Sequence, residues 1–295
     1  MPFTDAKGVI EGEKLKSMYG IEIKVMKEEV NSFITGIKEM DDIIGELIRG
    51  INTFYGGFGT GKSSLCQVYA INAVKCGLDV IYIDLEDKIT KVRLEQLRNA
   101  YGVEEGKLDE KLHLIRLRDL DELIKKVKED LIKEKFFNNS LLILDGFSSL
   151  YMREFRKVSN KFDLSDKKND FFFDLITLCT THNIVCIVTI KLKSELTLFK
   201  EVEQRKGIKQ KPKEGKEGEE KVVLKEDMEM SLLSDIMSFK HGQDMAYDSI
   251  CILRFVKQKS NRFFIIEKHP FKEEYCDSRK KYNYKITDGG IEIKQ

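Results

Sequence analysis

Short apolar runs alternate with amphipathic segments along the middle of the chain. Five runs are apolar at nearly every position, as strands buried on both faces of a parallel sheet require. They are Ile51 to Tyr55, Val80 to Asp84, Leu114 to Leu117, Leu141 to Asp145 and Ile184 to Thr189. The segments between them have helical periodicity. This alternation predicts an α/β fold in which helices cover both faces of a mostly parallel, twisted sheet.

Two of the intervening segments indicate how the helices pack. Residues 119–135 place apolar side chains on one face and lysines on the other, which predicts a solvated amphipathic helix capped by Asp119 or Asp121. The run Phe171, Phe172 and Phe173 fits a helix that faces the core. We interpret both segments as structural.

The pattern changes after Lys193. Residues 201–226 contain eight Lys or Arg, seven Glu and three Gly, a composition that cannot form a core, so we expect an insertion at about residues 195–240. Strand-like runs resume at residues 249–256, 261–271 and 282–293, and we expect them to extend the sheet antiparallel at its C-terminal edge. The chain is thus interpreted as an N-terminal extension, residues 1–34, followed by one domain, residues 35–295.

Composition narrows the choice of partners only a little. Lys and Arg number 51 and Asp and Glu 50, so the net charge of +1 provides no global attraction to nucleic acid or membranes, and any affinity for DNA must be local. No apolar stretch approaches the roughly 20 residues that span a bilayer, and the first residues lack a signal-peptide pattern. We expect a cytoplasmic or nucleoid-associated protein, nuclear in a eukaryote, with no membrane partner.

The cysteines and histidines show no metal-ligand spacing. The six cysteines include no C-x-x-C pair, and several lie in apolar runs, which is typical of buried free thiols in a reducing compartment. His113, His182 and His241 are likewise interpreted as structural. The chemistry of the chain must therefore come from other residues.

A glycine-rich loop follows the first apolar run and carries that chemistry. Its sequence is Gly56-Gly57-Phe58-Gly59-Thr60-Gly61-Lys62-Ser63, followed by Ser64 at the start of a helical segment. This matches the phosphate-binding pattern G-x-x-x-x-G-K-[ST] in the strand-then-helix context that the pattern requires. Backbone amides and the helix N-terminus would hold the phosphates, and Lys62 would reach the β- and γ-phosphates. The loop therefore predicts ATP binding.

Two carboxylates complete the expected site. Ser63 is placed to bind Mg²⁺, and Asp145, at the end of the buried run SLLILDG, supplies the carboxylate that the ion also needs. Hydrolysis requires a group that positions water near the γ-phosphate, and Glu86 follows the strand VIYID on the same side of the sheet. Asp84 and Asp87 are alternatives that spacing alone does not exclude.

Four segments together resemble the RecA/RadA recombinase family. They are TGIKEMDDIIGELIRGINTFYGGFGTGKSSLCQ, VIYIDLED, LLILDGFSSLYMREF and IVCIVTI, and the EKHPF segment is similar to the short archaeal paralogue group RadB. The resemblance covers roughly Thr35 to Thr189 and, less closely, Ser249 to Ile293. It implies a RecA-like P-loop fold and a weak, DNA-dependent ATPase that uses ATP and Mg²⁺ in DNA repair and recombination. The implied partners are single-stranded DNA and other copies of the chain or a recombinase paralogue.

The resemblance also implies roles for individual residues. The family's catalytic glutamate falls on Glu86, and Arg93 occupies the place where the family stacks an arginine or aromatic side chain on adenine. The first DNA-binding loop corresponds to YMREFRKVSNK, whose basic residues are Arg153, Arg156, Lys157 and Lys161. Each phosphate that they neutralise would add salt-dependent affinity. The second loop corresponds to residues 193–244, whose balanced charge favours a solvated insertion over a DNA clamp.

The chain departs from the family pattern in three places. Lys191 stands where recombinases usually carry a glutamine that couples the γ-phosphate to the second loop. The family's LGGG reads GELIRG here, with Gly45 and Gly50 remaining, and we interpret this as drift. The FIIEKHPF segment lacks the DSPxLP cap, but it places Lys268 where the ATP of a neighbouring subunit would lie in a filament.

The N-terminal segment suggests how subunits would meet. Phe3 and Ala6 match the FxxA pattern by which recombinase subunits dock, with an unstructured terminus as the alternative. The helix-hairpin-helix domain of RadA has no room before Thr35, which favours a paralogue or mediator. Two other functions remain open, namely a KaiC-like regulatory ATPase that acts on protein partners and a nucleotide-gated interaction module with little hydrolysis. A small-molecule kinase is disfavoured because no lid segment is recognisable.

Overall fold

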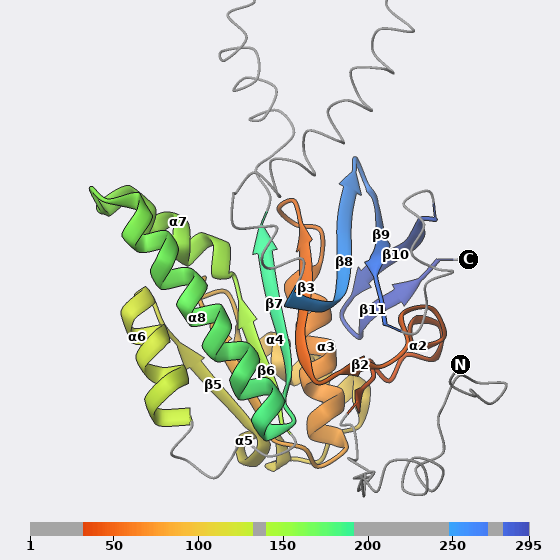
Figure 1. The fold of residues 1–295 in the computed structure, drawn as a ribbon. Coiled ribbons are helices and arrows are strands. Elements are labelled where there is room, and N and C mark those ends of the chain that lie inside the picture. The colour runs from red at the N-terminus through yellow and green to blue at the C-terminus, as the bar shows by residue number, and fades with distance from the viewer. Residues whose placement is uncertain (1–31, 132–139, 192–247, 271–279, 295) are drawn as a thin grey trace, which may run out of the picture. The chain divides into compact units, whose positions relative to one another are not determined.

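The computed structural model describes residues 32–131, 140–191, 248–270 and 280–294. Most of the strands in these residues belong to one large sheet. They are β3 (Gly50–Gly56), β4 (Val80–Asp84), β5 (Leu112–Arg116), β6 (Leu141–Asp145), β7 (Val185–Lys191), β8 (Ser249–Gln258), β9 (Asn261–Lys268), β10 (Tyr282–Thr287) and β11 (Gly290–Ile293). Their order across the sheet is β11-β10-β9-β8-β3-β7-β6-β4-β5 (Figure 1). Strand β1 (Ser32–Phe33) pairs with β2 (Leu47–Ile48) in a separate two-stranded sheet.

The five apolar runs form the adjacent parallel strands β3, β7, β6, β4 and β5 of the large sheet, as the sequence predicts, although β5 is an edge strand whose side chains are not fully buried. Strand β8 differs from the expected antiparallel arrangement, because it lies parallel to β3, with Phe255 beside Gly56. A parallel neighbour requires a long crossover connection, and the residues between β7 and β8 are numerous enough to supply one. The antiparallel edge begins only at β9, after a two-residue turn in which Lys259 has a φ of 56°.

Helices lie on both sides of this sheet (Figure 1). Those of the described residues are α2 (Lys38–Ile44), α3 (Lys62–Lys75), α4 (Lys91–Tyr101), α5 (Lys107–Lys111), α6 (Leu120–Lys125), the π-helix η1 (Lys126–Leu131), α7 (Phe147–Lys157) and α8 (Lys161–His182). Apolar side chains of α2, α3, α4 and α5 pack on one face of the sheet. Those of α6, α7 and α8 pack on the other face.

Two predicted helical features have a definite outcome. Asp119 is the residue that caps α6, because its side chain accepts hydrogen bonds from the backbone amides of Asp121 and Glu122. Phe171 and Phe172 are buried, but Phe173 is 71% exposed, so the prediction that all three face the core is wrong for Phe173. Successive helical residues are separated by about 100°, and a third consecutive side chain therefore points to solvent.

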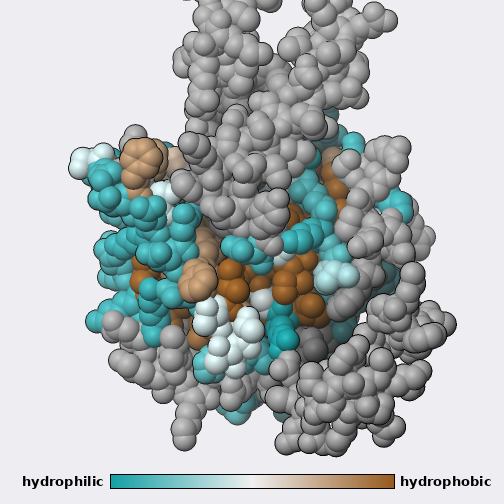
Figure 2. All heavy atoms as spheres, in the orientation of Figure 1, coloured by the Kyte–Doolittle hydropathy of each residue, from teal (hydrophilic) through white to brown (hydrophobic). Residues whose placement is uncertain are grey.

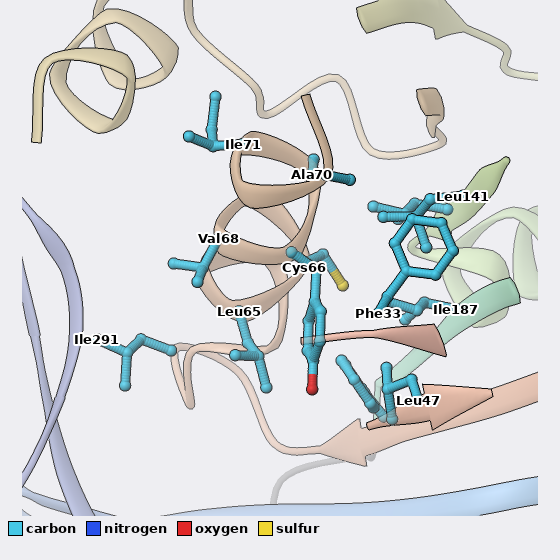
Figure 3. Close-up of a cluster of buried hydrophobic side chains, with 14 of the residues drawn as sticks. Phe33, Leu47, Leu65, Cys66, Val68, Ala70, Ile71, Leu141, Ile187 and Ile291 are labelled. Carbon is cyan, nitrogen blue, oxygen red and sulfur yellow. The ribbon is translucent and has the colours of Figure 1, made fainter. Parts of the chain in front are cut away.

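Helix α3 is the most deeply buried of the helices on its face of the sheet. Figure 3 shows Leu65, Cys66, Val68, Ala70 and Ile71 projecting from it in several directions. Leu141 and Ile187 of the central strands lie on one side of the helix, and Ile291 of β11 lies on the other. Because strand β3 leads directly into the loop before α3, this packing fixes both ends of that loop.

The remaining sequence expectations concern thiols and membranes. Among the described cysteines, Cys66, Cys179, Cys186 and Cys251 are buried free thiols, as expected, and Cys76 is exposed. Helices that combine the length and hydropathy needed to cross a bilayer do not occur in the described part of the chain.

We predict that Ile187→Ala destabilises the domain by about 2–5 kcal/mol, because it leaves a cavity in a fully buried central strand. Urea denaturation followed by circular dichroism measures the change in the free energy of unfolding. Val92→Ala is the matched control, since Val92 is 69% exposed and the change should cost about 0.5 kcal/mol or less. Equal losses for both variants would contradict this description of the core.

Candidate functional site

The glycine-rich loop connects the end of β3 to the start of α3. Gly61 precedes the helix with a φ of 103°, a left-handed conformation that favours glycine. Gly56 has a φ of 152°, and a Cβ atom there would lie 2.0 Å from the carbonyl oxygen of Phe255. The close approach of β8 therefore requires glycine at the point where β3 becomes the loop.

The C-terminal strands hold this loop from the side. The hydroxyl of Tyr284 on β10 donates a hydrogen bond to the carbonyl oxygen of Thr60. Arg262 on β9 donates from Nε to the carbonyl oxygen of Gly59 at 3.1 Å. Two loop carbonyls are thus engaged from outside the loop.

Lys62 lies folded against the loop that precedes it. Its ammonium donates to the carbonyl oxygens of Gly56 at 2.9 Å and Gly57 at 2.8 Å. Burial lowers the pKa of Lys62 to about 8, although the nearby carboxylates of Asp145 and Glu86 oppose this effect. The lysine is therefore mostly charged at neutral pH, and an anion beside it would stabilise its proton further.

Asp145 lies at the end of β6, and side chains from three elements donate to its carboxylate. Ser63 of α3 donates at 3.1 Å and Thr189 of β7 at 2.6 Å, both to Oδ1. Tyr82 of β4 donates to Oδ2 at 2.9 Å. Burial raises the pKa of Asp145, and the three hydrogen bonds counteract part of that rise. A carboxylate in this position joins the loop helix to both strands that flank β6.

Geometry distinguishes the three acidic residues that follow β4. The carboxylate of Asp84 is buried and accepts hydrogen bonds from the backbone amides of Glu86, Lys88 and Ile89, so it shapes the loop. Asp87 forms ion pairs with Arg116 and Arg118. Glu86 is the one of the three whose charge raises the pKa of Lys62 in the glycine-rich loop, residues 56–63, which is called the P-loop below.

Glu86 accepts hydrogen bonds from the Ser149 hydroxyl at the start of α7 and from the ammonium of Lys88. Partial burial raises the pKa of Glu86, but these two hydrogen bonds and the charges of Lys88 and Lys191 lower it more, so the net pKa lies below the ordinary value. The side chain is therefore an anion at neutral pH.

The side chain of Glu86 packs directly against the backbone of Gly146. Its φ is 94°, and a Cβ atom at this position would lie 2.4 Å from Cγ of Glu86. The backbone amide of Gly146 donates to the Thr189 hydroxyl at 2.7 Å, and that hydroxyl in turn donates to Asp145. One glycine thus joins the surroundings of both carboxylates.

The residues predicted to contact adenine and DNA are not among the partners of the two carboxylates. Arg93 of α4 donates to the carbonyl oxygens of Thr287 and Asp288 in the β10–β11 turn. Of the segment YMREFRKVSNK, all but residues 158–160 is helical, belonging to α7 and α8. Its basic side chains therefore stand mostly on helices and not on an extended loop.

Those basic side chains have different surroundings. Arg153 points inward, donating to the carbonyl oxygens of Arg118 at 3.1 Å and Leu85 at 3.5 Å. Arg156 and Lys157 are exposed at the end of α7, and Lys157 pairs with Glu154 at 2.8 Å. Lys161 begins α8, and its side chain lies outside the described part of the structure.

Lys268 ends β9 beside Ile252. It lies at the opposite end of that strand from Arg262, which contacts its own chain's P-loop. The proposed docking residues Phe3 and Ala6, His241 and the expected insertion at residues 195–240 lie outside the described residues.

Sequence reasoning did not find the residues that hold the carboxylates in place. They are Tyr82, Lys88, Gly146, Ser149 and Thr189. It also did not find Arg262 and Tyr284, which hold carbonyl groups of the P-loop. Thr189, a polar residue within an apolar strand, and Gly146, directly after Asp145, carried a usable signal. The contacts of Arg262 and Tyr284 depend on the tertiary fold and leave no local pattern.

The residues present fit a magnesium ion. Ser63 and Asp145 offer hard oxygen donors 3.1 Å apart, which Mg²⁺ prefers. Three of the approximately four lone-pair positions of the Asp145 carboxylate are occupied by hydrogen bonds, which leaves capacity for one further donor such as water on the ion. Phosphate oxygens and water would complete the coordination.

A parallel sheet that carries a P-loop at the carboxyl end of β3, Asp145 at the end of β6 and Glu86 just after β4 defines a P-loop nucleotide-binding protein with a RecA-like fold. The family model for Rad51 matches residues 26–216, more than half of the chain, and the chain belongs to this family. The family match agrees with the resemblance found in the sequence.

Individual relatives agree with this assignment. The chain is 24% identical over 218 residues to the DNA repair and recombination protein RadA of Ignicoccus hospitalis, and 26% identical over 214 residues to RadA of Methanoculleus marisnigri. These alignments cover 68% and 65% of this chain but 66% of each RadA, so the chain spans just under two thirds of their length. It is 26% identical over 255 residues to the DNA repair and recombination protein RadB of Methanocaldococcus jannaschii, which covers 85% of this chain and 97% of that protein.

We predict that one lysine titrates near pH 8, more than two units below an ordinary lysine. Burial disfavours the charged form of Lys62, so its proton should be lost as the pH rises through about 8. NMR spectra of the protein labelled with ¹³C at the lysine ε-carbons measure this directly. The early-titrating signal should be absent from Lys62→Arg, and a wild-type spectrum without such a signal would contradict the burial argument.

Proposed function

We propose that this chain is an ATP-dependent, single-stranded-DNA-binding recombinase paralogue or mediator that acts in DNA repair and homologous recombination and hydrolyses ATP slowly. The observation that carries the proposal is that Lys62, Ser63, Asp145 and Glu86 lie together at the carboxyl ends of the parallel strands. The match over 97% of a protein named DNA repair and recombination protein RadB supports a role in DNA repair and recombination.

Each residue has a definite part in the proposed hydrolysis. The backbone amides after Gly56 and the N-terminus of α3 bind the phosphates, and Lys62 adds a charge that the phosphates keep protonated. Ser63 and Asp145 would hold Mg²⁺, which would neutralise charge on the phosphate oxygens. Glu86, anionic at neutral pH, orients the attacking water and accepts its proton.

The end of α7 and the start of α8 provide the proposed DNA surface. Arg156 and Lys157 are exposed there, and Phe162, a few residues farther on, is 82% exposed. Positive side chains attract the phosphate backbone, and an exposed aromatic ring gives a base a surface on which to stack. Figure 2 shows hydrophilic side chains over most of the α7 and α8 side of this face, with single apolar ones among them. Arg153 is engaged internally and is not part of this surface.

Contacts between subunits complete the proposal. Lys268 lies at the end of β9 away from its own P-loop, which is compatible with a contact to the ATP of a neighbouring copy. Phe3 and Ala6 would dock one copy, or a related recombinase, onto the next. Arg93 would stack on adenine beside the β10–β11 turn that it already contacts.

We predict that labelled single-stranded DNA binds the protein more tightly with ATP than with ADP or without nucleotide, as measured by fluorescence anisotropy. Lys62→Ala should abolish the dependence on nucleotide. Phe162→Ala should weaken binding by about 1–3 kcal/mol through lost base stacking. Phe173→Ala is the matched control, because this phenylalanine is also exposed on α8 but lies about three helical turns beyond Phe162.

The outcomes separate the alternatives. Nucleotide binding with no DNA binding in any state would favour a KaiC-like regulatory ATPase or a nucleotide-gated interaction module and would sink the DNA proposal. Equal effects of Phe162→Ala and Phe173→Ala would move the DNA site away from the start of α8.

We predict that Ser149→Ala lowers kcat for ATP hydrolysis, by up to about 10²-fold, with little change in KM, because Glu86 loses the hydroxyl that positions it. Gly146→Ala should act in the same direction, since its methyl group would displace Glu86. Steady-state phosphate release measures both constants.

Glu86→Gln sets the lower limit of that assay, and Ser149→Thr should restore part of the rate. Thr177→Ala is the neutral control, because it removes a hydroxyl that bonds only within an exposed turn of α8. Wild-type turnover equal to that of Glu86→Gln would contradict the proposed hydrolysis. A normal kcat in Ser149→Ala would contradict the positioning role.

A further inference from the structure

The P-loop carries an exposed aromatic ring that two lysines contact. Phe58 is 73% exposed. The ammonium of Lys88 lies 5.4 Å from the centroid of its ring, and that of Lys191 lies 5.1 Å from the same centroid. An ammonium above an aromatic face is attracted by the ring's electron density, so both charges are held beside the P-loop.

The two lysines reach the ring from different parts of the fold. Lys191 ends β7 in register with Gly56, and its backbone amide donates to the Ser148 hydroxyl at 2.8 Å. Lys88 lies in the loop after β4, where Asp84 accepts its backbone amide at 2.8 Å. Both backbones are thus fixed, while the ends of both side chains are attached to long, rotatable stems.

The position of these lysines matches the end of a triphosphate. Strands β4 and β7 flank β6, which carries Asp145. The N-terminus of α3 and Lys62 would hold the inner phosphates of the proposed ATP, and the outermost phosphate would then approach Glu86 and Lys191, whose charges both act on Lys62. The charge of Lys191 lowers the pKa of both Glu86 and Lys62.

We propose that Lys88 and Lys191 together bind the γ-phosphate and make the site selective for a nucleoside triphosphate over the diphosphate. Phe58 holds the two ammonium groups near the P-loop until the phosphate, a stronger partner, replaces the ring. Lys88 also leaves the carboxylate of Glu86 in this exchange, so the same event that binds the triphosphate frees Glu86 to accept a proton. This inference rests on the proposed ATP binding.

The test compares the affinities of a non-hydrolysable fluorescent ATP analogue and of fluorescent ADP. Lys88→Met and Lys191→Met should each weaken binding of the triphosphate about tenfold or more, because a charge-assisted hydrogen bond is lost. ADP affinity should change less than about twofold, the size of an ordinary surface substitution. Phe58→Leu should lower the ratio of the two affinities by a smaller factor.

Lys75→Met is the matched control, because Lys75 is an exposed lysine at the other end of α3. If the ratio of triphosphate to diphosphate affinity is the same in the lysine variants as in the wild type, Lys88 and Lys191 do not bind the γ-phosphate selectively. That result would overturn this inference and leave nucleotide binding intact. If the wild-type protein binds neither nucleotide, or if Lys62→Ala binds both as tightly as the wild type, the proposed function fails together with this inference. Circular dichroism confirms that each variant is folded.

Discussion

The buried carboxylate of Asp145 is the interaction on which the site depends. An ionised group taken out of water is costly unless polar partners surround it, and Asp145 obtains these from Ser63, Thr189 and Tyr82. Each partner belongs to a different element, so satisfying one carboxylate fixes α3, β7 and β4 relative to β6. The position of α3 is therefore fixed partly by the need of the Asp145 carboxylate for hydrogen-bond donors.

Glu86 is positioned by a second set of contacts that shares residues with the first. Gly146 gives Glu86 room and passes a hydrogen bond through Thr189 to Asp145. A group that orients water must be held closely to be effective, because small displacements are costly in rate. Because both carboxylates are placed around one backbone position, the proposed Mg²⁺ ligand and the proposed water-orienting group are structurally coupled.

Much of this arrangement was predictable from the sequence, for identifiable reasons. Buried parallel strands leave uninterrupted apolar runs, and the P-loop has a strict local pattern, so the central strands, Lys62, Ser63 and Asp145 could be recognised. The preference for Glu86 over its acidic neighbours came from family resemblance and stays a prediction, while the structure shows that backbone amides engage Asp84 and that arginines pair with Asp87. The direction of β8 and the inward orientation of Arg153 could not be predicted, since both depend on which segments meet in three dimensions.

The C-terminal strands add a dependence of another kind. The P-loop is among the first elements of the described fold to be synthesised, yet its carbonyl groups at Gly59 and Thr60 are held by Arg262 and Tyr284, more than two hundred residues later. During translation the loop therefore gains its last supports only when β9 and β10 have left the ribosome. A product truncated before β9 would retain the sequence motif but would lack both of these hydrogen bonds.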